Sequence, residues 1–459
     1  MHTTMCGIAG FVGANARART LEMVKAIRHR GPDGERVWDH GDVSMGHAHL
    51  KVTGDVEQPA VSGDRAVVFN GEIYNYAGFL PGSSDTMALA DVILKDGMDS
   101  FLKAAPSIDG EYAFAYFDGS GLMLARDPAG IKPLFYGRSG DGFGFASERK
   151  ALMRAGIREI KALAPGHVYH DGAEREAIGL PPYDPAIKDV AEASVALDEA
   201  LAHAVSLRAH KDAAVAFSGG VDCSLIGAMS GLPMCTVGLK GSYDVRAAKK
   251  AASLMGVEKR HVVYEFDEDD VEDALPEVAY AVESADPMKV SIALPLFILA
   301  REARRDGYKV LLSGQGADEL FGGYARHESA AGDGRLPGAL QHDLEHIAEV
   351  NLERDDAATM AHGIELRVPY LDMRVIGVAQ RTDPSLKVYF DGKNYIRKYV
   401  LRKMSEKYLP REVSYAPKKA IQYGTSTRKT LEKLALKRNF KDTKGYLQSL
   451  YEGISWPLA

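Results

Sequence analysis

Cysteine is scarce in this sequence. The 459 residues contain three cysteines, namely Cys6, Cys223 and Cys235. An odd and sparse set does not form a disulfide framework, and these cysteines have no C-x-x-C metal-binding spacing. The sequence therefore predicts a protein of a reducing compartment, and we expect it in the cytoplasm.

Long hydrophobic runs are also lacking. No apolar stretch has the length of about 18 residues that a bilayer-spanning helix needs. The N-terminus has no cationic segment followed by a long apolar run, so it does not resemble a secretory signal. The sequence therefore predicts no membrane association.

A strong charge of one sign is missing as well. The formal net charge is −7, which argues against a dedicated nucleic-acid or membrane surface. Hydrophobic residues make up 46% and charged residues 26%, the balance of an ordinary globular protein. A chain of 459 residues is too long for one core, so two or three domains are expected.

The first third consists mainly of short β-prone runs separated by Gly, Asp, Asn and Pro. One helix-like stretch, Thr86–Asp96, interrupts them. This pattern predicts many strands with few helices. The expected strands are Ile8–Val12, Val43–Val52, Ala66–Phe69, Glu111–Phe117, Leu122–Ala125 and Gly142–Ala146.

The pattern changes after a Leu-Pro-Pro-Tyr-Asp-Pro segment within Gly179–Lys188, which indicates a linker. Short apolar runs then alternate with stretches of helical period, which predicts a doubly wound parallel sheet. From about Asp343 the chain is expected to be mostly helical. The predicted boundaries are a domain at 6–176, a linker at 177–190 and a domain at 191–459. The expected strands of the second domain are Ala213–Phe217, Met234–Val237, His261–Tyr264 and Lys309–Leu312.

A glycine-rich turn follows the first of these strands. Its residues are Phe217, Ser218, Gly219, Gly220, Val221, Asp222, Cys223 and Ser224. A turn between strand and helix directs backbone N–H groups and the helix dipole at one point, which suits a phosphate. The turn lacks the Gly-Lys-Ser/Thr ending of a Walker loop, and Asp222 offers a hard oxygen ligand for Mg²⁺ instead. The alternative is a glycine turn that connects the strand to the helix and binds no ligand.

A second acidic loop strengthens the nucleotide interpretation. Ser313, Gly314, Gln315 and Gly316 follow another apolar strand and lead to Asp318 and Glu319. Loops at the carboxyl ends of parallel strands converge on the ligand, so Asp222 and Asp318 are expected to share Mg²⁺ on one nucleotide. Lys418 could neutralise charge that develops on phosphorus, although a lysine pair is usually a solvated surface feature.

The N-terminal segment contains a candidate nucleophile, Cys6. A terminal α-amine has a pKa of about 7.7–8.0 and can activate its own thiol, provided that Cys6 becomes the first residue. If Cys6 does not become the first residue, it is most simply interpreted as a small buried side chain of a strand. Asn70 and Gly71 follow a strand and supply donors for an oxyanion. Asp85 could hold a substrate ammonium group.

Taken together, these motifs resemble the glutamine-hydrolysing asparagine synthetases over nearly the whole chain. The first half is similar to a class II glutamine amidotransferase domain, and the second to an ATP pyrophosphatase-type synthetase domain. The matching segments are Cys6-Gly7-Ile8, His29 to Asp33, Asn70 to Asn75, Ser84-Asp85, Ala125 to Leu134, Phe145 to Glu148, Ser218 to Ser224, Ser313 to Tyr324 and Gly363 to Asp372.

The resemblance implies an N-terminal-nucleophile αββα sandwich followed by the ATP-dependent domain. It implies that Cys6 attacks glutamine, with Asn70 and Gly71 as oxyanion donors and Glu72 and Asp85 at the substrate. Ammonia then converts aspartate, activated by ATP as β-aspartyl-AMP, into asparagine. Val237, Ser313 and Gly314 match nucleotide contacts, and Lys418 a charge-stabilising lysine. The expected partners are these small molecules, and a homodimer is left open.

Three departures from the family pattern stand out. Five residues precede Cys6, so the thiol gains its amine only if they are removed. His49 stands where the family has a carboxylate-binding arginine, and we expect His49 and Lys51 to bind the glutamine carboxylate more weakly together. Gln315 replaces a glutamate and cannot take a proton, so a base is expected from Glu319, Glu365 or solvent.

Two other classes remain open. One is a related amidotransferase-ligase that acts on another carboxylate, or an ammonia-dependent synthetase with an impaired glutaminase. The other is a non-catalytic homologue that binds nucleotide and partners. ATP turnover to AMP separates an enzyme from a binding protein, and the acid that triggers pyrophosphate release separates the ligases.

Overall fold

The computed structural model describes residues 4–51, 57–78, 84–140, 142–170, 172–417 and 421–454. The chain divides into two compact units, which are described separately below. Unit 1 includes residues 1–180 and the later segment Asn351–Gly363, and unit 2 includes Pro181–Val350 and Ile364–Ile454. The predicted domain boundaries remain a proposal, and the assignment of 351–363 to unit 1 has no counterpart in them.

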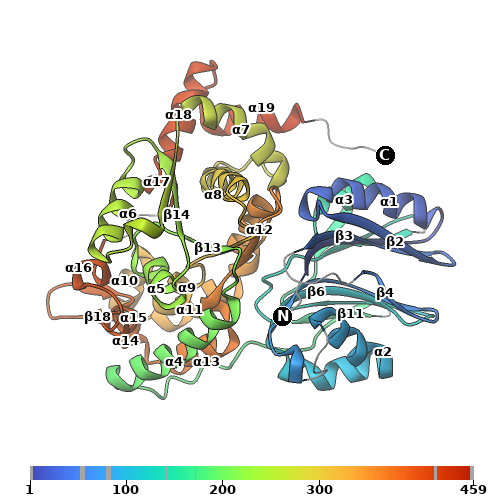
Figure 1. Cartoon of the computed structure of the whole chain (residues 1–459), viewed down its shortest axis with the longest axis horizontal. Coiled ribbons are helices and arrows are strands. Elements are labelled where there is room, and N and C mark those ends of the chain that lie inside the picture. Colours follow the sequence, from blue (N-terminus) through green and yellow to red (C-terminus); the bar gives the residue numbers. More distant parts are fainter. Residues whose placement is uncertain are drawn as a thin grey trace. The chain divides into compact units, whose positions relative to one another are not determined.

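Unit 1 contains two antiparallel sheets (Figure 1). The first has the order β10-β8-β9-β1-β3-β2 and the second the order β12-β11-β7-β6-β5-β4. The strands of the first are β1 Thr4–Val12, β2 Gly34–His40, β3 Val43–Lys51, β8 Phe135–Ser139, β9 Gly142–Ala146 and β10 Glu159–Ala162. Those of the second are β4 Ala60–Ser62, β5 Arg65–Ile73, β6 Gly110–Phe117, β7 Leu122–Arg126, β11 His167–His170 and β12 Ala173–Glu176.

Three apolar layers hold unit 1 together. Helices α1 (Ala16–Ala26) and α3 (Arg149–Arg154) pack on the outer face of the first sheet, and α2 (Asp85–Ala104) packs on that of the second. The inner faces of the two sheets form the third layer, with Ile8, Met45 and Val68 among its residues. This is the αββα sandwich that the resemblance implied, and the order of layers is visible in Figure 1.

Alternation along the strands places the candidate residues of unit 1. Successive side chains of a strand point to opposite faces, so every second residue shares a face. Ile8 of β1, Met45 of β3 and Val68 of β5 face the layer between the sheets. Cys6, His47, His49, Asn70 and Glu72 are spaced from them by two or four residues and therefore continue these inner faces.

Unit 2 is built on a parallel sheet with the order β15-β14-β13-β16-β17. Strands β14 and β16 lie on either side of β13, so the strand order reverses at β13. Ligands of open α/β sheets bind beyond the carboxyl ends of the strands at such a reversal. The strands are β13 Ala213–Ala216, β14 Met234–Leu239, β15 His261–Phe266, β16 Val310–Leu312 and β17 Glu365–Arg367.

Helices flank this sheet and make up most of the chain after it, as the sequence predicts (Figure 1). The helices before residue 350 are α4 Val190–Arg208, α5 Val221–Ser230, α6 Tyr243–Leu254, α7 Glu268–Ala281, α8 Pro287–Arg305, α9 Ala317–Phe321, α10 Ala325–Gly332 and α11 Leu336–Glu345. The later helices of unit 2 are α13 Met373–Arg381, α14 Pro384–Lys387, α15 Tyr399–Ser405, α16 Arg411–Ser414, α17 Ile421–Gly424, α18 Thr427–Lys437 and α19 Thr443–Glu452. A small hairpin joins β18 Val388–Phe390 to β19 Tyr395–Arg397.

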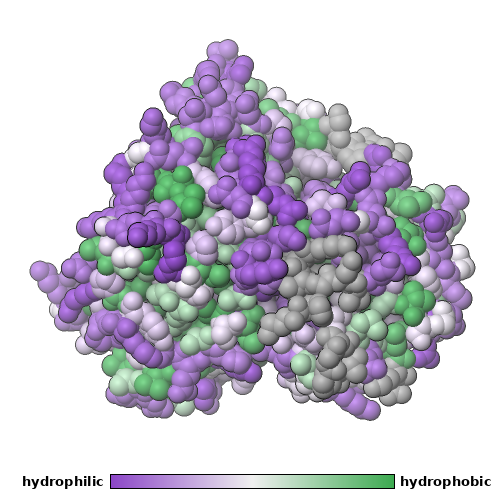
Figure 2. All heavy atoms as spheres, viewed as in Figure 1, coloured by the Kyte–Doolittle hydropathy of each residue, from purple (hydrophilic) through white to green (hydrophobic). Residues whose placement is uncertain are grey.

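The surface in view is mainly hydrophilic, and its hydrophobic side chains form small separate groups (Figure 2). Within the described ranges, none of the helices combines the length and the apolar character that a membrane crossing requires.

Candidate active sites

The thiol of Cys6 lies between the two sheets of unit 1. Strands β1 and β3 pair antiparallel, and their register sets Cys6 directly opposite His49. The Cys6 side chain is buried, and its Sγ lies 3.9 Å from Nδ1 of His49. His47 lies two residues earlier on the same face of β3, and burial together with His49 lowers its pKa to about 3. The thiol therefore lies beside two imidazole side chains.

Strand β5 brings Asn70 to the main chain of Cys6. The backbone N–H of Cys6 donates to Oδ1 of Asn70 at 3.3 Å. Among the residues that the structure describes, Nδ2 of this buried amide has no hydrogen-bond partner. A buried donor without a partner costs about 1–3 kcal/mol, and a bound oxyanion would satisfy it.

Position 71 requires glycine, both for its backbone conformation and for the lack of space around it. Its φ is 150°, and a Cβ at this position would lie 2.1 Å from the carbonyl oxygen of Glu111 on β6. A side chain there would push β5 and β6 apart. The glycine therefore allows β5 and β6 to pair closely beside Asn70, whose Oδ1 accepts from Cys6.

Two acidic side chains, Glu72 and Asp85, are buried nearby on β5 and at the start of α2. Burial and the charge of Glu72 raise the pKa of Asp85 well above its ordinary value. A ligand with an ammonium group would relieve this repulsion between carboxylates. The remaining predicted glutamine contact, Lys51, pairs with Thr4 at the end of β3, and its side chain lies outside the described part.

A buried charge network supports the strand that carries Cys6. Arg30 Nε donates to the carbonyl oxygen of Cys6 at 3.5 Å, and its Nη1 contacts Glu148 at 2.9 Å and Asp356 at 2.7 Å. Glu148 also contacts Lys150 at 2.8 Å and His29 at 3.0 Å. Sequence motifs mark His29, Arg30 and Glu148, but nothing in them indicates Asp356 as a partner.

In unit 2 the glycine-rich turn connects β13 to α5. Gly219 has a φ of 76°, and a Cβ there would lie 2.8 Å from the carbonyl oxygen of Ala247 on α6. The N–H of Ser218 donates to Sγ of Cys223 at 3.2 Å, which closes the turn. Gly220 is the N-cap of α5 and offers no side-chain cap, and the positive end of the helix dipole at this turn suits an anion.

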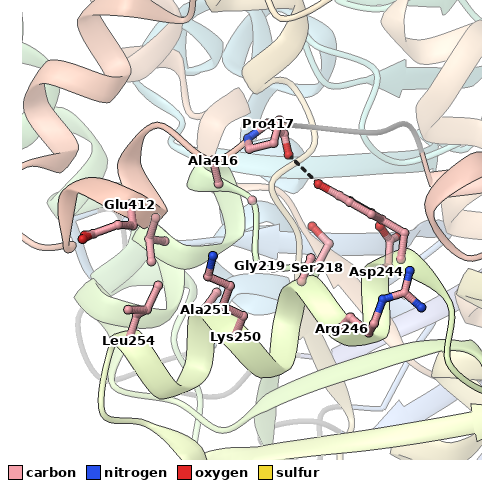
Figure 3. A pocket seen from close by; sticks show the side chains of 14 residues that line it. Ser218, Gly219, Asp244, Arg246, Lys250, Ala251, Leu254, Glu412, Ala416 and Pro417 are labelled. Atoms are coloured by element: carbon pink, nitrogen blue, oxygen red, sulfur yellow. Dashed lines mark hydrogen bonds between the residues drawn. The ribbon is translucent and has the colours of Figure 1, made fainter.

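A pocket of about 300 Å³ opens beside this turn. Ser218, Gly219 and Gly220 line one side, and Arg246 and Lys250 reach it from α6. Figure 3 shows the Lys250 amine extending toward Gly219, with Ala416 and Pro417 opposite. Ala251 and Leu254 add apolar lining, so the pocket offers cations for phosphates and an apolar wall for a ring. Arg246 and Lys250 carry no sequence motif, although their spacing of four residues places them on one helix face.

Pro417 lines this pocket and directly precedes Lys418. Lys418 itself lies outside the described residues, so its predicted role remains a proposal.

The two acidic loops meet at a lysine that no sequence motif indicates. Nζ of Lys398 lies 2.7 Å from Asp222 Oδ2 and 2.8 Å from Asp318 Oδ1, and its side chain is 2% exposed. Gly323 leaves room for this contact, because a Cβ there would lie 1.7 Å from Asp318 Oδ1. Two carboxylates that converge on one cation form a hard-oxygen donor set, and this set fits Mg²⁺.

The second loop lies at the same edge of the sheet. Ser313 follows β16, whose last residue Leu312 pairs with Val215 of β13. A Cβ on Gly314 would lie 2.8 Å from Cβ of Asp222, so the two loops touch. The other predicted nucleotide residues follow β13, open α5 or extend β14 beyond its pairing with β13. They are Phe217, Val221, Cys223, Ser224 and Val237.

Of the three residues predicted for adenylate formation, the structure places two beside these loops. Gln315 donates its N–H to Ser313 Oγ at 3.2 Å, and buried Glu319 accepts from Tyr324 Oη at 2.5 Å. Glu365 pairs with Val310 at the opposite end of β16 and contacts Arg367 at 2.7 Å. The structure thus does not bring Glu365 to this cluster, because the strand direction turns it toward the amino edge of the sheet.

Comparisons with known proteins match residues of both units. The model of the glutamine amidotransferase domain matches residues 5–165, and that of asparagine synthase matches residues 196–337 and 328–449. A protein of Methanocaldococcus jannaschii, provisionally named glutamine-hydrolysing asparagine synthetase 1, is 33% identical over 95% of this chain and 96% of its own. The glutamine-hydrolysing asparagine synthetase of Sandersonia aurantiaca is 30% identical over 92% of this chain and 87% of its own.

Among solved structures, glutamine phosphoribosylpyrophosphate amidotransferase from B. subtilis, complexed with ADP and GMP, aligns with a TM-score of 0.35. It is 19% identical, over 57% of this chain and 65% of its own. The family assignment rests on the sequence matches, which extend across both units and confirm the resemblance seen in the motifs. The chain belongs to the glutamine-hydrolysing asparagine synthetase family of ligases.

Proposed function

We propose that this protein converts aspartate to asparagine with ATP, using ammonia that it releases from glutamine. The other products are glutamate, AMP and pyrophosphate. The observation that carries the proposal is the convergence of Asp222 and Asp318 on one cation beside the glycine-rich turn. A phosphate turn and a carboxylate pair at one sheet edge are what adenylate formation requires.

In unit 1, the Cys6 thiolate adds to the side-chain carbonyl carbon of glutamine. The free α-amine of Cys6 takes the thiol proton, so the chemistry needs residues 1–5 to be removed. Asn70 Nδ2 and the Gly71 N–H then stabilise the oxyanion. Ammonia leaves, and water hydrolyses the remaining thioester to glutamate and the free thiol.

The carboxylates of Glu72 and Asp85 bind the ammonium group of glutamine in this proposal. The raised pKa of Asp85 supports it, because a bound cation removes the repulsion that raises the pKa. His49 and Lys51 bind the α-carboxylate. Imidazole and ammonium groups lack the two-pronged geometry of a guanidinium, so we expect weak glutamine binding. This departure also favours an ammonia-dependent synthetase as the second candidate function.

In unit 2, the β-carboxylate of aspartate attacks the α-phosphorus of ATP, and pyrophosphate leaves. The turn from Ser218 to Ser224 orients the phosphates, and Arg246 and Lys250 neutralise their charge from α6. Asp222 and Asp318 would hold Mg²⁺, which lowers the negative charge on the phosphates when it is bound. Lys398 fixes these two carboxylates, and Lys418 stabilises charge on phosphorus.

Ammonia then attacks the acyl carbon of β-aspartyl-AMP, AMP leaves, and asparagine forms. A base must accept a proton from the incoming ammonia. Gln315 cannot do so and positions the substrate instead. Glu319 is buried and hydrogen-bonded to Tyr324, so it is better placed than Glu365, which is paired with Arg367.

The acceptor acid is tested by pyrophosphate release. With ATP, Mg²⁺ and saturating ammonia, we expect aspartate to trigger release at a rate at least about 100-fold above glutamate, since one additional methylene in a tight site costs about 1–3 kcal/mol and a misplaced carboxylate costs more. Release with another carboxylate and none with aspartate would identify a ligase of different specificity.

A further inference from the structure

Three side chains that bind metal ions gather around the glutaminase thiol. They are Cys6, His47 and His49, and one ligand atom from each lies within 4.8 Å of the others. The register of β1 and β3 brings Cys6 opposite His49, and alternation puts His47 on the same face. Cys6 lies far from the two histidines in the sequence, so no local spacing motif reveals the cluster.

The shape of the cluster suits a small cation. When three atoms lie within 4.8 Å of one another, some point lies within about 2.8 Å of all three. Zinc–sulfur and zinc–nitrogen bonds are about 2.3 and 2.0–2.1 Å long, so inward movements of less than about 1 Å by each ligand atom complete the site. Three protein ligands leave a fourth position open to water.

His47 gives an independent indication of a ligand. Its side chain is 1% exposed, and within the described ranges its Nε2 has no hydrogen-bond partner. Buried polar atoms are normally satisfied by protein, water or an ion. His49 is partly exposed, whereas Cys6 and His47 are buried.

The donor set selects the kind of metal. One thiolate and two imidazoles are borderline-soft ligands that prefer zinc and its neighbours over Mg²⁺ or Ca²⁺. An arginine at position 49 has no lone pair to offer, so it would leave two ligands. The histidine at this position is therefore what completes the set.

We propose that Cys6, His47 and His49 bind a zinc-class divalent cation that holds the glutaminase in an inactive state. The thiol proton leaves to solvent, a metal–sulfur bond forms, and the sulfur lone pair is no longer available to attack glutamine. The cation site stands by itself, whereas its regulatory effect rests on the proposed function. Release of the metal restores the thiol without any redox step.

Cobalt(II) is the probe for the site, added to the purified full chain without substrates. We expect one equivalent to give a thiolate-to-cobalt charge-transfer band together with the visible bands of a tetrahedral ion. Cys6→Ala should abolish the charge-transfer band, and His47→Asn and His49→Arg should each weaken binding at least tenfold. Cys235→Ala removes another buried cysteine and should leave the spectrum unchanged. A spectrum without the band, or one that survives Cys6→Ala, would overturn the proposal.

The regulatory effect needs a second measurement, the formation of AMP with either nitrogen source. We expect zinc to inhibit glutamine-dependent synthesis at least tenfold and to leave ammonia-dependent synthesis unchanged, and a zinc-selective chelator should reverse the inhibition. Equal inhibition with both nitrogen sources would overturn the regulatory role. Absence of any glutamine-dependent activity in metal-free protein would count against the proposed function. The cobalt spectrum would still show whether the three side chains bind a metal ion.

Discussion

Lys398 connects the two acidic loops of the proposed ATP site in unit 2. Its ammonium group lies between Asp222 and Asp318, and all three side chains have little or moderate exposure. Its own φ is 55°, a left-handed conformation that a lysine adopts only when its surroundings require it. The left-handed backbone and the two ion pairs together indicate that the surroundings of Lys398 fix its ammonium group between the two carboxylates.

We expect Lys398→Met to destabilise unit 2 by about 3–5 kcal/mol, because it leaves two close carboxylates without their cation. AMP formation should fall on the order of 10²–10³-fold, since the carboxylates lose their fixed positions. Thermal unfolding and AMP turnover measure the two effects.

Lys407→Met is the matched control, because Lys407 is an exposed lysine paired with Asp198. Its thermal unfolding should stay close to that of the wild type, because an exposed ion pair contributes little to stability. If Lys398→Met behaved like this control in both measurements, the proposed role of Lys398 would be wrong.

Among the helices, α12 (Glu353–Met360) belongs to the glutaminase unit although it lies far along the chain. Its carboxylates meet arginines of the first third: Asp356 contacts Arg30 at 2.7 Å, and Glu353 contacts Arg126 at 3.4 Å. Arg30 in turn joins Glu148, so the helix is part of the charge network below Cys6.

Glu148 dominates the pH dependence of this network. Burial opposes its ionisation, but His29, Lys150 and Arg30 outweigh burial and hold its pKa well below the ordinary value. A carboxyl group with a lowered native pKa stabilises the fold above its unfolded pKa of about 4.3, and this contribution is lost as the pH falls toward the native pKa.

Glu148→Gln should therefore cost about 3–5 kcal/mol at pH 7 and progressively less below about pH 4.3. Urea titrations followed by tryptophan fluorescence measure this loss, since Trp38 lies on β2 of this unit. Glu22→Gln removes an exposed partner of Arg154 and should change stability by at most about 1 kcal/mol. A pH-independent difference for Glu148→Gln would contradict the network.

The strands were the most predictable elements. Short β-prone and apolar runs identified β1, β3, β6 and the parallel strands β13 to β16, because a buried strand leaves its pattern in a few consecutive residues. Helices α1 and α3 were not expected, because α1 buries few apolar side chains and α3 is only six residues long, so neither shows a sustained helical period. The placement of α12 depends on partners about two hundred to three hundred residues away, which no local pattern records.

The same distinction applies to the sites. Cys6, Asn70 and Asp222 stand in short motifs, so the sequence predicted them before their positions were known. Lys398 and the Cys6–His47–His49 cluster arise from strand register and loop convergence, which appear only in three dimensions. Glu365 is the opposite case, since its motif is present but the strand direction carries it away from the loops.

At the scale of the whole molecule, the proposed function joins glutamine hydrolysis in unit 1 to an ATP-dependent ligation in unit 2. Free ammonia is scarce and mostly protonated near neutral pH, so local release raises its effective concentration for the ligase. Unit 1 has the thiol and the proposed oxyanion donors, and unit 2 has the proposed phosphate turn and the carboxylate pair. Family membership across both units supports one enzyme with two steps.

The state of Cys6 decides whether the first step operates. Its α-amine exists only after residues 1–5 are removed, and intact mass reports this directly. We expect glutamine-dependent activity to rise in proportion to the fraction of protein that begins at Cys6. Full activity in protein that retains Met5 would show that another base, such as His49 at 3.9 Å, activates the thiol.

The most direct test of the two-step enzyme compares AMP formation from aspartate and ATP in the wild type and in Cys6→Ala, each with glutamine or with ammonia. The wild type should use both nitrogen sources. Cys6→Ala should lose at least about 10³-fold with glutamine, because the nucleophile is absent, and retain its rate with ammonia. Glutamine-dependent synthesis that survives Cys6→Ala, or ammonia-dependent synthesis that is lost with it, would contradict the division of chemistry between the two units.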